Sequence, residues 1–261
     1  MGNNENALTQ PIHRVIHHND LTDIPLAGLT ATEKSIFMTA VHKAYNTGDK
    51  AVYLDPSVTR KMIGYKRADP KRFKNILDSF SDKIIELKGE KKYTENDKEL
   101  THKLNLVTDT FYTNEGHLAI MFNESFLYLF NYPLTFNNFI LEEYGAISSK
   151  HAQECYHCLC RFRDTGVWVT TIEYFKKKCE IPEDTPNKKI KVYLENFKKA
   201  LSPYFEDLDY ELKKGGYRNL EIIGIKMTFK PQKKTKADKT KPLPLTEPMV
   251  DQDEKETNKK C

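Results

Sequence analysis

Hydrophobic positions between Asn187 and Leu201 recur with the spacing of an α-helix. Ile190, Leu194, Phe197 and Leu201 follow the i, i+4, i+7, i+11 pattern of one buried face. The opposite face is polar and largely basic, and it carries Lys188, Val192, Glu195 and Lys199, flanked by Lys191 and Asn196. The pattern therefore predicts an amphipathic helix with one face in a core and a basic face in solvent.

The segments on either side of this helix follow a recognisable order. A short helical pattern at 172–179 precedes it, joined by the turn-rich link IPEDTPN. Ser202-Pro203 is expected to stop the helix, and two strand-like runs then meet at Gly215-Gly216. Helix, turn, basic helix and hairpin is the order of a winged helix-turn-helix, whose second helix enters a DNA groove.

The first half of the chain shows the same order. Thr30 or Thr32 can cap a first helix, and Asp55-Pro56 supplies an N-cap and first-turn proline for a later one. The expected elements are helix 29–46, strand 51–54, helix 57–63, helix 71–85, a loop or hairpin extension at 87–98, and strands at 103–112 and 117–122.

Residues 148–229 repeat this order with little shared sequence. A helix starts at Ser148-Ser149 and ends at Gly166, a short strand follows at 167–169, and the two helices and the hairpin around 187–201 complete the set. An identical order at similar spacing indicates a structural repeat. We therefore predict an α+β fold of tandem winged helix-turn-helix domains.

The pattern also predicts how the chain is divided. The connector contains many Phe, Tyr and Leu residues, so we expect a helix and packed segments there, which would fix the angle between the two domains. The predicted divisions are a flexible arm at 1–24, an N-terminal winged-helix domain at 25–123, a packed connector at 124–147, a C-terminal winged-helix domain at 148–230, and a disordered tail at 231–261.

Positive charge is concentrated on the two basic helices. The formal net charge of the chain is only +4. Seven Lys and Arg stand against one acid between Arg60 and Lys74, and fifteen stand against nine acids between Tyr174 and Lys234. Charge alone fits a solvated surface equally well, but two basic blocks on two helix-turn-helix patterns indicate binding to a phosphate backbone.

The candidate DNA-binding residues lie on the outer faces of these helices, on the turn before the first, and at the second hairpin. They are Arg60, Lys61, Lys66, Arg67, Lys71, Arg72, Lys74, Asn75, Lys188, Lys189, Lys191, Asn196, Lys199, Lys213, Lys214 and Arg218.

Catalytic and metal-binding patterns are weak by comparison. Cys155, Cys158 and Cys160 lie close to His151 and His157, but Cys155 is on the core stripe and Cys160 points elsewhere, so we expect core packing with a few exposed thiols. There is no phosphate-binding loop of the GxxxxGK[ST] type and no nicking motif of alternating histidines with a nearby tyrosine. We predict a protein without catalytic residues, metal or cofactor.

Targeting signals are also weak. The N-terminus has no basic region followed by an apolar core, and no apolar run is long enough to span a bilayer. The chain has five cysteines, an odd number, and three of them lie on one predicted helix, which fits a reducing compartment. These features predict a cytoplasmic protein without a membrane partner.

Several phrases of the sequence resemble one known family. They are Phe139-Ile140-Leu141-Glu142-Glu143-Tyr144, the Ser pair at 148–149, Arg163-Asp164-Thr165-Gly166, the run Leu201-Ser202-Pro203-Tyr204-Phe205, and the N-terminal phrase LTATEKSIFMTAVHKAYNTGDKAVYLD. In these phrases the chain resembles the initiator Rep proteins of theta-replicating, iteron-containing bacterial plasmids, especially those of Gram-positive hosts. The resemblance covers roughly residues 25–231.

The resemblance implies a set of partners and activities. Two winged helices would bind repeated origin sequences (iterons) in double-stranded DNA and promote origin opening. A homodimer in equilibrium with a monomer would control activity, and the host initiator and helicase would be recruited.

Two positions depart from the family pattern. Val192 stands where relatives carry an Arg on the outer face of the second recognition helix, and Glu195 stands where they often carry a Lys. Either the DNA sequence that is read differs, or the reading residues are displaced to neighbouring positions. Two other functions remain open, namely a winged-helix transcription repressor and a nicking or priming enzyme of a mobile element.

Overall fold

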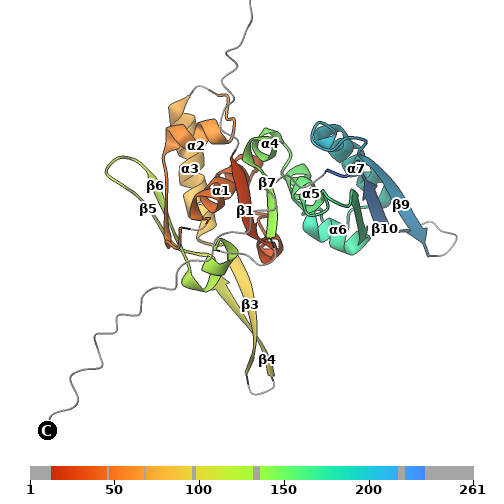
Figure 1. Cartoon of the computed structure of the whole chain (residues 1–261), viewed down its shortest axis with the longest axis horizontal. Coiled ribbons are helices and arrows are strands. Elements are labelled where there is room, and N and C mark those ends of the chain that lie inside the picture. Colours follow the sequence, from red (N-terminus) through yellow and green to blue (C-terminus); the bar gives the residue numbers. More distant parts are fainter. Residues whose placement is uncertain are drawn as a thin grey trace, which may run out of the picture.

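Two units of similar architecture lie side by side in the computed structural model, and a two-stranded hairpin projects from the first (Figure 1). The structure describes residues 13–45, 47–67, 69–95, 98–131, 136–216 and 221–232, with residues 91–95, 98–100 and 102 described by their backbone alone. No helix in these ranges is long and apolar enough to cross a bilayer.

The two units share element order and sheet topology. The first contains α1 (Ala31–Ala44), β2 (Ala51–Leu54), α2 (Pro56–Met62), α3 (Pro70–Ile84), β5 (Val107–Tyr112) and β6 (Leu118–Phe122). The second contains α5 (Lys150–Cys160), β8 (Val167–Thr171), α6 (Ile172–Lys178), α7 (Asn187–Leu201), β9 (Asp209–Gly215) and β10 (Glu221–Thr228). Their three-stranded sheets have the orders β2-β6-β5 and β8-β10-β9, so the last strand is central in both. The predicted structural repeat is confirmed.

Local sequence signals place the helix starts. Asp55 accepts hydrogen bonds from the backbone amides of Ser57 and Val58 at 2.7 and 2.8 Å, with Pro56 in the first turn of α2. Asp69 caps α3 in the same way. Of the two candidate caps for α1, Thr30 is used, in a capping box with Glu33. The helices of the first unit therefore begin and end within about two residues of the predicted bounds.

Helix α7 has the predicted bounds and the predicted orientation. Ile190, Leu194, Phe197 and Leu201 are at most 1% exposed. The backbone amide of Ser202 still bonds to Lys198, and the helix ends there, as expected from the following proline. The basic face consequently points to solvent.

The prediction of a flexible arm over residues 1–24 is wrong from residue 13 onward. Strand β1 (Arg14–His18) pairs antiparallel with β7 (Phe136–Ile140), and a 3-10 helix, η1 (Asn19–Asp23), follows. Val15 and His17 are fully buried. The strand was missed because its partner lies more than 100 residues away and its inward face includes a histidine. Residues 1–12, and 233–261 of the predicted tail, lie outside the described part of the chain.

The connector contains a 3-10 helix, η2 (Glu124–Leu129), then β7 and the short helix α4 (Leu141–Ala146). Its apolar residues Phe126, Leu129 and Phe139 are buried. The predicted helix is thus divided into two short pieces, because β7 finds a hydrogen-bonding partner in β1.

The predicted strand at 103–112 is also divided. Strands β3 (Lys88–Glu95) and β4 (Lys98–Asn105) form a separate hairpin. Of the loop and the hairpin extension expected at 87–98, the structure therefore has the hairpin extension. Leu106 interrupts the strand, because its side chain is fully buried and its amide donates to the Leu87 carbonyl at 2.8 Å. The β3–β4 hairpin extends away from the rest of the unit (Figure 1).

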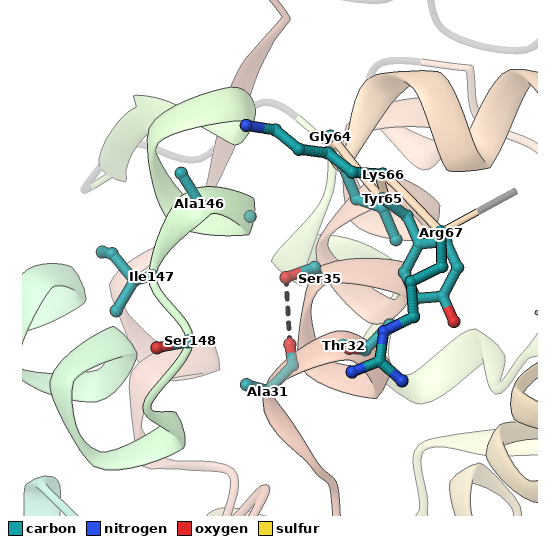
Figure 2. Close-up of a pocket in the computed structure, with 12 residues that line it drawn as sticks. Ala31, Thr32, Ser35, Gly64, Tyr65, Lys66, Arg67, Ala146, Ile147 and Ser148 are labelled. Atoms are coloured by element: carbon teal, nitrogen blue, oxygen red, sulfur yellow. Dashed lines mark hydrogen bonds between the residues drawn. The ribbon is translucent and has the colours of Figure 1, made fainter.

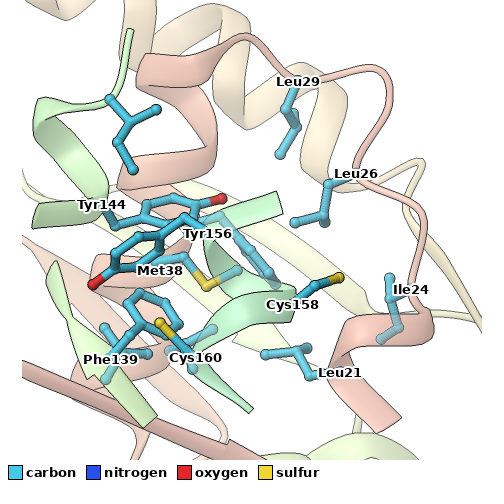
Figure 3. Packing of buried hydrophobic residues seen from close by; sticks show 14 of the residues in the cluster. Leu21, Ile24, Leu26, Leu29, Met38, Phe139, Tyr144, Tyr156, Cys158 and Cys160 are labelled. Carbon is cyan, nitrogen blue, oxygen red and sulfur yellow. The ribbon is translucent and has the colours of Figure 1, made fainter. Parts of the chain in front are cut away.

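Helix α5 is the part of the second unit that packs against the first, and it is buried on nearly every side. It contacts α1 and β7 on one side and α6 and α7 on the other. Figure 3 shows Leu21, Ile24 and Leu26 of the N-terminal segment in one cluster with Tyr156 and Cys158 of α5. The two winged helices are therefore joined through a shared core.

The same packing buries the cysteine side chains of the second unit. Cys155, Cys158, Cys160 and Cys179 are all buried, so the expectation of a few exposed thiols is wrong. Burial raises the pKa of the Cys160 thiol to about 12, and it raises that of Cys158 as well. These thiols stay protonated at neutral pH and act as small apolar side chains.

Candidate nucleic-acid interface

The outer face of α7 carries unpaired positive charge. Lys188, Lys189, Lys191, Asn196 and Lys199 are all exposed. Other lysines of the second unit pair with carboxylates, namely Lys198 with Asp209, Lys226 with Glu211 and Lys230 with Glu206. Within the described ranges Lys188, Lys189, Lys191 and Lys199 have no such partner, so their charge is available to an external anion.

The outer face of α3 is the counterpart in the first unit. Lys71, Arg72, Lys74 and Asn75 are exposed there. The Lys74 ammonium lies 5.8 Å from the centre of the Tyr112 ring on β5. The Tyr112 hydroxyl in turn donates to Asp78 of α3 at 2.7 Å, which fixes the hairpin against this helix.

The last turn of α2 and the turn that joins it to α3 contribute four more basic residues. Arg60 donates from Nη2 to the Arg67 carbonyl at 2.7 Å, and its guanidinium lies 5.9 Å from the Phe73 ring centre. Arg60 therefore closes the turn as well as carrying charge. Lys61, Lys66 and Arg67 are exposed.

Lys66 and Arg67 also line a pocket of about 290 Å³ between the α2–α3 turn and the link from α4 to α5 (Figure 2). Ser35 from α1 and Ser148 from the link add hydroxyl groups to its wall. Gly145 permits the close approach, since a Cβ there would lie 2.6 Å from the Ile63 carbonyl oxygen. The pocket brings two cations of the first unit to the boundary with the second.

The two wings differ in charge. In the second unit, Lys213 and Lys214 are exposed on β9 next to the turn at Gly216, which has φ +72°. Arg218 lies in the range 217–220, outside the described residues. The first-unit turn from Thr113 to His117 contains no Lys or Arg, and it includes Glu115. The basic wing is thus specific to the second unit.

The structure therefore places the predicted residues in two groups. Of those that the structure describes, one group lies on the end of α2, the turn that follows and α3, and the other lies on α7 and the β9 end of the wing. Lys198, which is not among the predicted residues, pairs with Asp209, a contact that joins a helix to a strand and leaves no local signal in the sequence.

Comparison with known proteins agrees with this geometry. The family model described as "Initiator Replication protein, WH1" matches residues 14–160, which is more than half of the chain. The span begins with β1 and ends with α5. No curated protein sequence matches.

Two solved structures are similar. The crystal structure of Pi initiator protein in complex with iteron DNA has a TM-score of 0.64 and 14% identity, covering 83% of this chain and 96% of that chain. A structure of domains 2 and 3 of RctB has a TM-score of 0.44 and 16% identity, covering 77% of this chain and 80% of that chain. At this identity the first match supports the tandem winged-helix fold alone. With the family match over residues 14–160, this chain belongs to the initiator replication protein family.

Proposed function

We propose that this protein initiates replication of a plasmid by binding repeated origin sequences, with α3 and α7 each entering a groove of double-stranded DNA. The observation that carries the proposal is the unpaired basic outer face of α7, on a helix whose other face is buried. The similar fold of Pi initiator protein, which was crystallised with iteron DNA, supports it. Two such helices held in one rigid body would read two segments about one helical turn apart.

The proposal includes the steps after DNA binding. The protein would act by binding and deforming DNA rather than by breaking bonds, and would need neither metal nor cofactor. The protein would promote opening of the origin and would recruit the host initiator and helicase in the cytoplasm. It would also exchange between a monomer and a homodimer. The proposed domains at 25–123 and 148–230 would each supply one winged helix to the DNA site, and the connector at 124–147 would fix the angle between them.

Footprinting on the DNA that flanks the gene, at two salt concentrations and with a probe for opened strands, tests this function. An iteron-binding initiator protects DNA segments that repeat at about two helical turns, and this protection decreases steeply at higher salt. Thymines in adjacent AT-rich DNA then become reactive to the probe for opened strands. A single protected operator without opened strands would indicate a transcription repressor instead. A cut strand in the presence of divalent metal would indicate a nicking enzyme.

The double variant Lys188→Ala plus Lys191→Ala tests the role of α7. If both lysines neutralise phosphates, the slope of log K against log salt becomes shallower by about 2, and affinity falls at low salt. The matched control is Lys226→Ala plus Lys230→Ala, which removes the same charge from residues paired with Glu211 and Glu206. Equal slopes for the two double variants would show that these two lysines of α7 do not contact phosphates.

A further inference from the structure

The outer face of α7 has an apolar centre. Val192 is 55% exposed, and it is the one apolar residue among the exposed positions of this helix. It lies opposite the buried stripe that contains Ile190 and Leu194, with Lys188 one turn before it. Val192 is therefore the one apolar side chain that the exposed face of α7 offers to a binding partner.

The chemistry of the major groove suggests what such a side chain meets. Among the groups that bases present there, the thymine C5-methyl is the apolar one, and apolar side chains recognise it by contact. Phosphate contacts position a protein on DNA, whereas contacts to base edges specify the sequence. Val192 is therefore placed to recognise the base sequence. The surrounding lysines are placed to bind phosphates and so to position α7 on the DNA.

Glu195 lies on the same face and is held in place from the sheet. The Tyr210 hydroxyl on β9 donates to Glu195 Oε1 at 2.5 Å. Partial burial, and then this hydrogen bond, raise the pKa of Tyr210 to about 12, so the hydroxyl keeps its proton at neutral pH. The second carboxylate oxygen, Oε2, is left to accept a hydrogen bond from outside.

A carboxylate on a DNA-binding face costs affinity, because it repels phosphates. It also repels the acceptor edge of guanine, and it accepts a hydrogen bond from the N4 amino group of cytosine. Glu195 is three residues after Val192, a rise of about 4.5 Å along the helix, so both side chains can reach the same short segment of a groove.

We propose that Val192 and Glu195 are the base-reading residues of α7, with Val192 contacting a thymine methyl group and Glu195 accepting from the amino group of a cytosine at a neighbouring base pair. The inference rests on the proposed function, since it requires α7 to lie in the major groove. Tyr210 acts as a positioning residue that orients the carboxylate.

Deoxyuridine substitution tests the role of Val192, because it removes only the thymine methyl group. Each thymine of a protected repeat is replaced in turn, and binding of the full-length protein is measured by fluorescence anisotropy. We expect a loss of about fourfold at one position, the effect of one buried methyl group. Val192→Ala should bind the methylated and unmethylated forms of that position equally.

Val169 provides the matched control. It is 56% exposed on β8 of the same unit, so Val169→Ala removes the same atoms from an equally exposed site away from α7. This variant should retain the sensitivity to deoxyuridine. If no thymine of a bound repeat shows the methyl effect, or if Val192→Ala retains it, the assignment of Val192 is overturned while the initiator function stands.

Glu195→Gln tests the second contact. Discrimination for cytosine at the neighbouring position should fall by about tenfold, while affinity for non-specific DNA rises because one negative charge is gone. Glu206→Gln removes the same charge from an exposed loop and should leave cytosine discrimination unchanged. Tyr210→Phe should weaken discrimination without raising non-specific affinity. Unchanged discrimination in Glu195→Gln overturns this contact, and failure of the wild-type protein to bind any repeat overturns the proposed function together with the inference.

Discussion

Replacement of Lys34 by methionine is expected to lower the free energy of unfolding by about 3–5 kcal/mol, the usual cost of removing one partner from a buried ion pair. The Lys34 side chain is fully buried on α1. Its ammonium lies 2.6 Å from Glu154 Oε1 on α5 and 2.7 Å from Glu180 Oε1 after α6. Without it, two carboxylates would face each other away from water.

The surroundings of Glu154 strengthen this expectation. Burial raises the pKa of its carboxyl group, Lys34 opposes the increase, and Glu180 adds to it. Glu180 has a left-handed backbone, with φ 54°, directly after the end of α6. A methionine of similar length keeps the packing of the stem but loses the cation.

Urea unfolding followed by circular dichroism measures the effect. Lys50→Met is the matched control, because Lys50 pairs with Glu124 at the surface, where both side chains are more than half exposed. It should cost no more than about 1 kcal/mol. Adding Glu154→Gln and Glu180→Gln to Lys34→Met should recover part of the loss. Equal midpoints for Lys34→Met and Lys50→Met would contradict the assignment.

Acidification from pH 6.5 to pH 4 is expected to lower the free energy of unfolding by about 3 kcal/mol through His17 alone. Burial lowers the pKa of His17 from 6.5 to about 4, and a shift of one pKa unit corresponds to about 1.4 kcal/mol. The unfolded chain therefore takes up a proton near pH 6.5 that the folded protein excludes until about pH 4. The contribution of His17 to the free energy of unfolding is therefore fully present above pH 6.5, and it is lost as the pH falls from 6.5 to about 4.

The geometry explains why protonation is resisted. The His18 carbonyl can only accept, so His17 Nδ1, at 2.8 Å, carries the hydrogen. His17 Nε2 is then the acceptor for Nε2–H of His157, also at 2.8 Å. A second proton on His17 would place two N–H groups against each other. Burial also lowers the pKa of His157, with the charge of His17 as the next cause.

Urea denaturation at pH 7.5, 6.5, 5.5 and 4.5 tests this expectation. Carboxylates also begin to titrate at the acid end of this range. The informative quantity is therefore the difference in the free energy of unfolding between wild type and His17→Gln at each pH. The variant should show a shallower pH dependence between 6.5 and 4.5. His117→Gln, at a partly exposed site near Asp55, is the control and should keep the wild-type slope. An unchanged slope in His17→Gln would contradict the mechanism.

Both predictions concern contacts that join the two units. Gln153 on α5 adds to them by donating to the Ala31 carbonyl at 3.1 Å and to the Tyr144 carbonyl at 3.0 Å. Asn137 on β7 donates to the His157 carbonyl at 3.0 Å. A junction this polar and this buried constrains the relative orientation of α3 and α7, and therefore the spacing of the DNA segments that they would read.

Local patterns determined much of the architecture. The bounds of α7, the caps at Asp55 and Asp69, and the repeated order of helices and strands all follow from interactions within a few residues of each other. Helix periodicity and capping are properties of short windows, so a sequence reports them directly. The basic outer faces of α3 and α7 follow from the same periodicity.

Long-range pairing decided the rest. Strand β1 forms because β7 lies beside it. Helix α5 buries a Lys–Glu pair, a histidine pair and its cysteines because the first unit and the β1–β7 strands cover it. The tertiary structure also selected which lysines remain free, since Lys198 and Lys226 find carboxylates on neighbouring strands. Burial and charge pairing depend on residues far apart in the chain, and no local pattern carries that information.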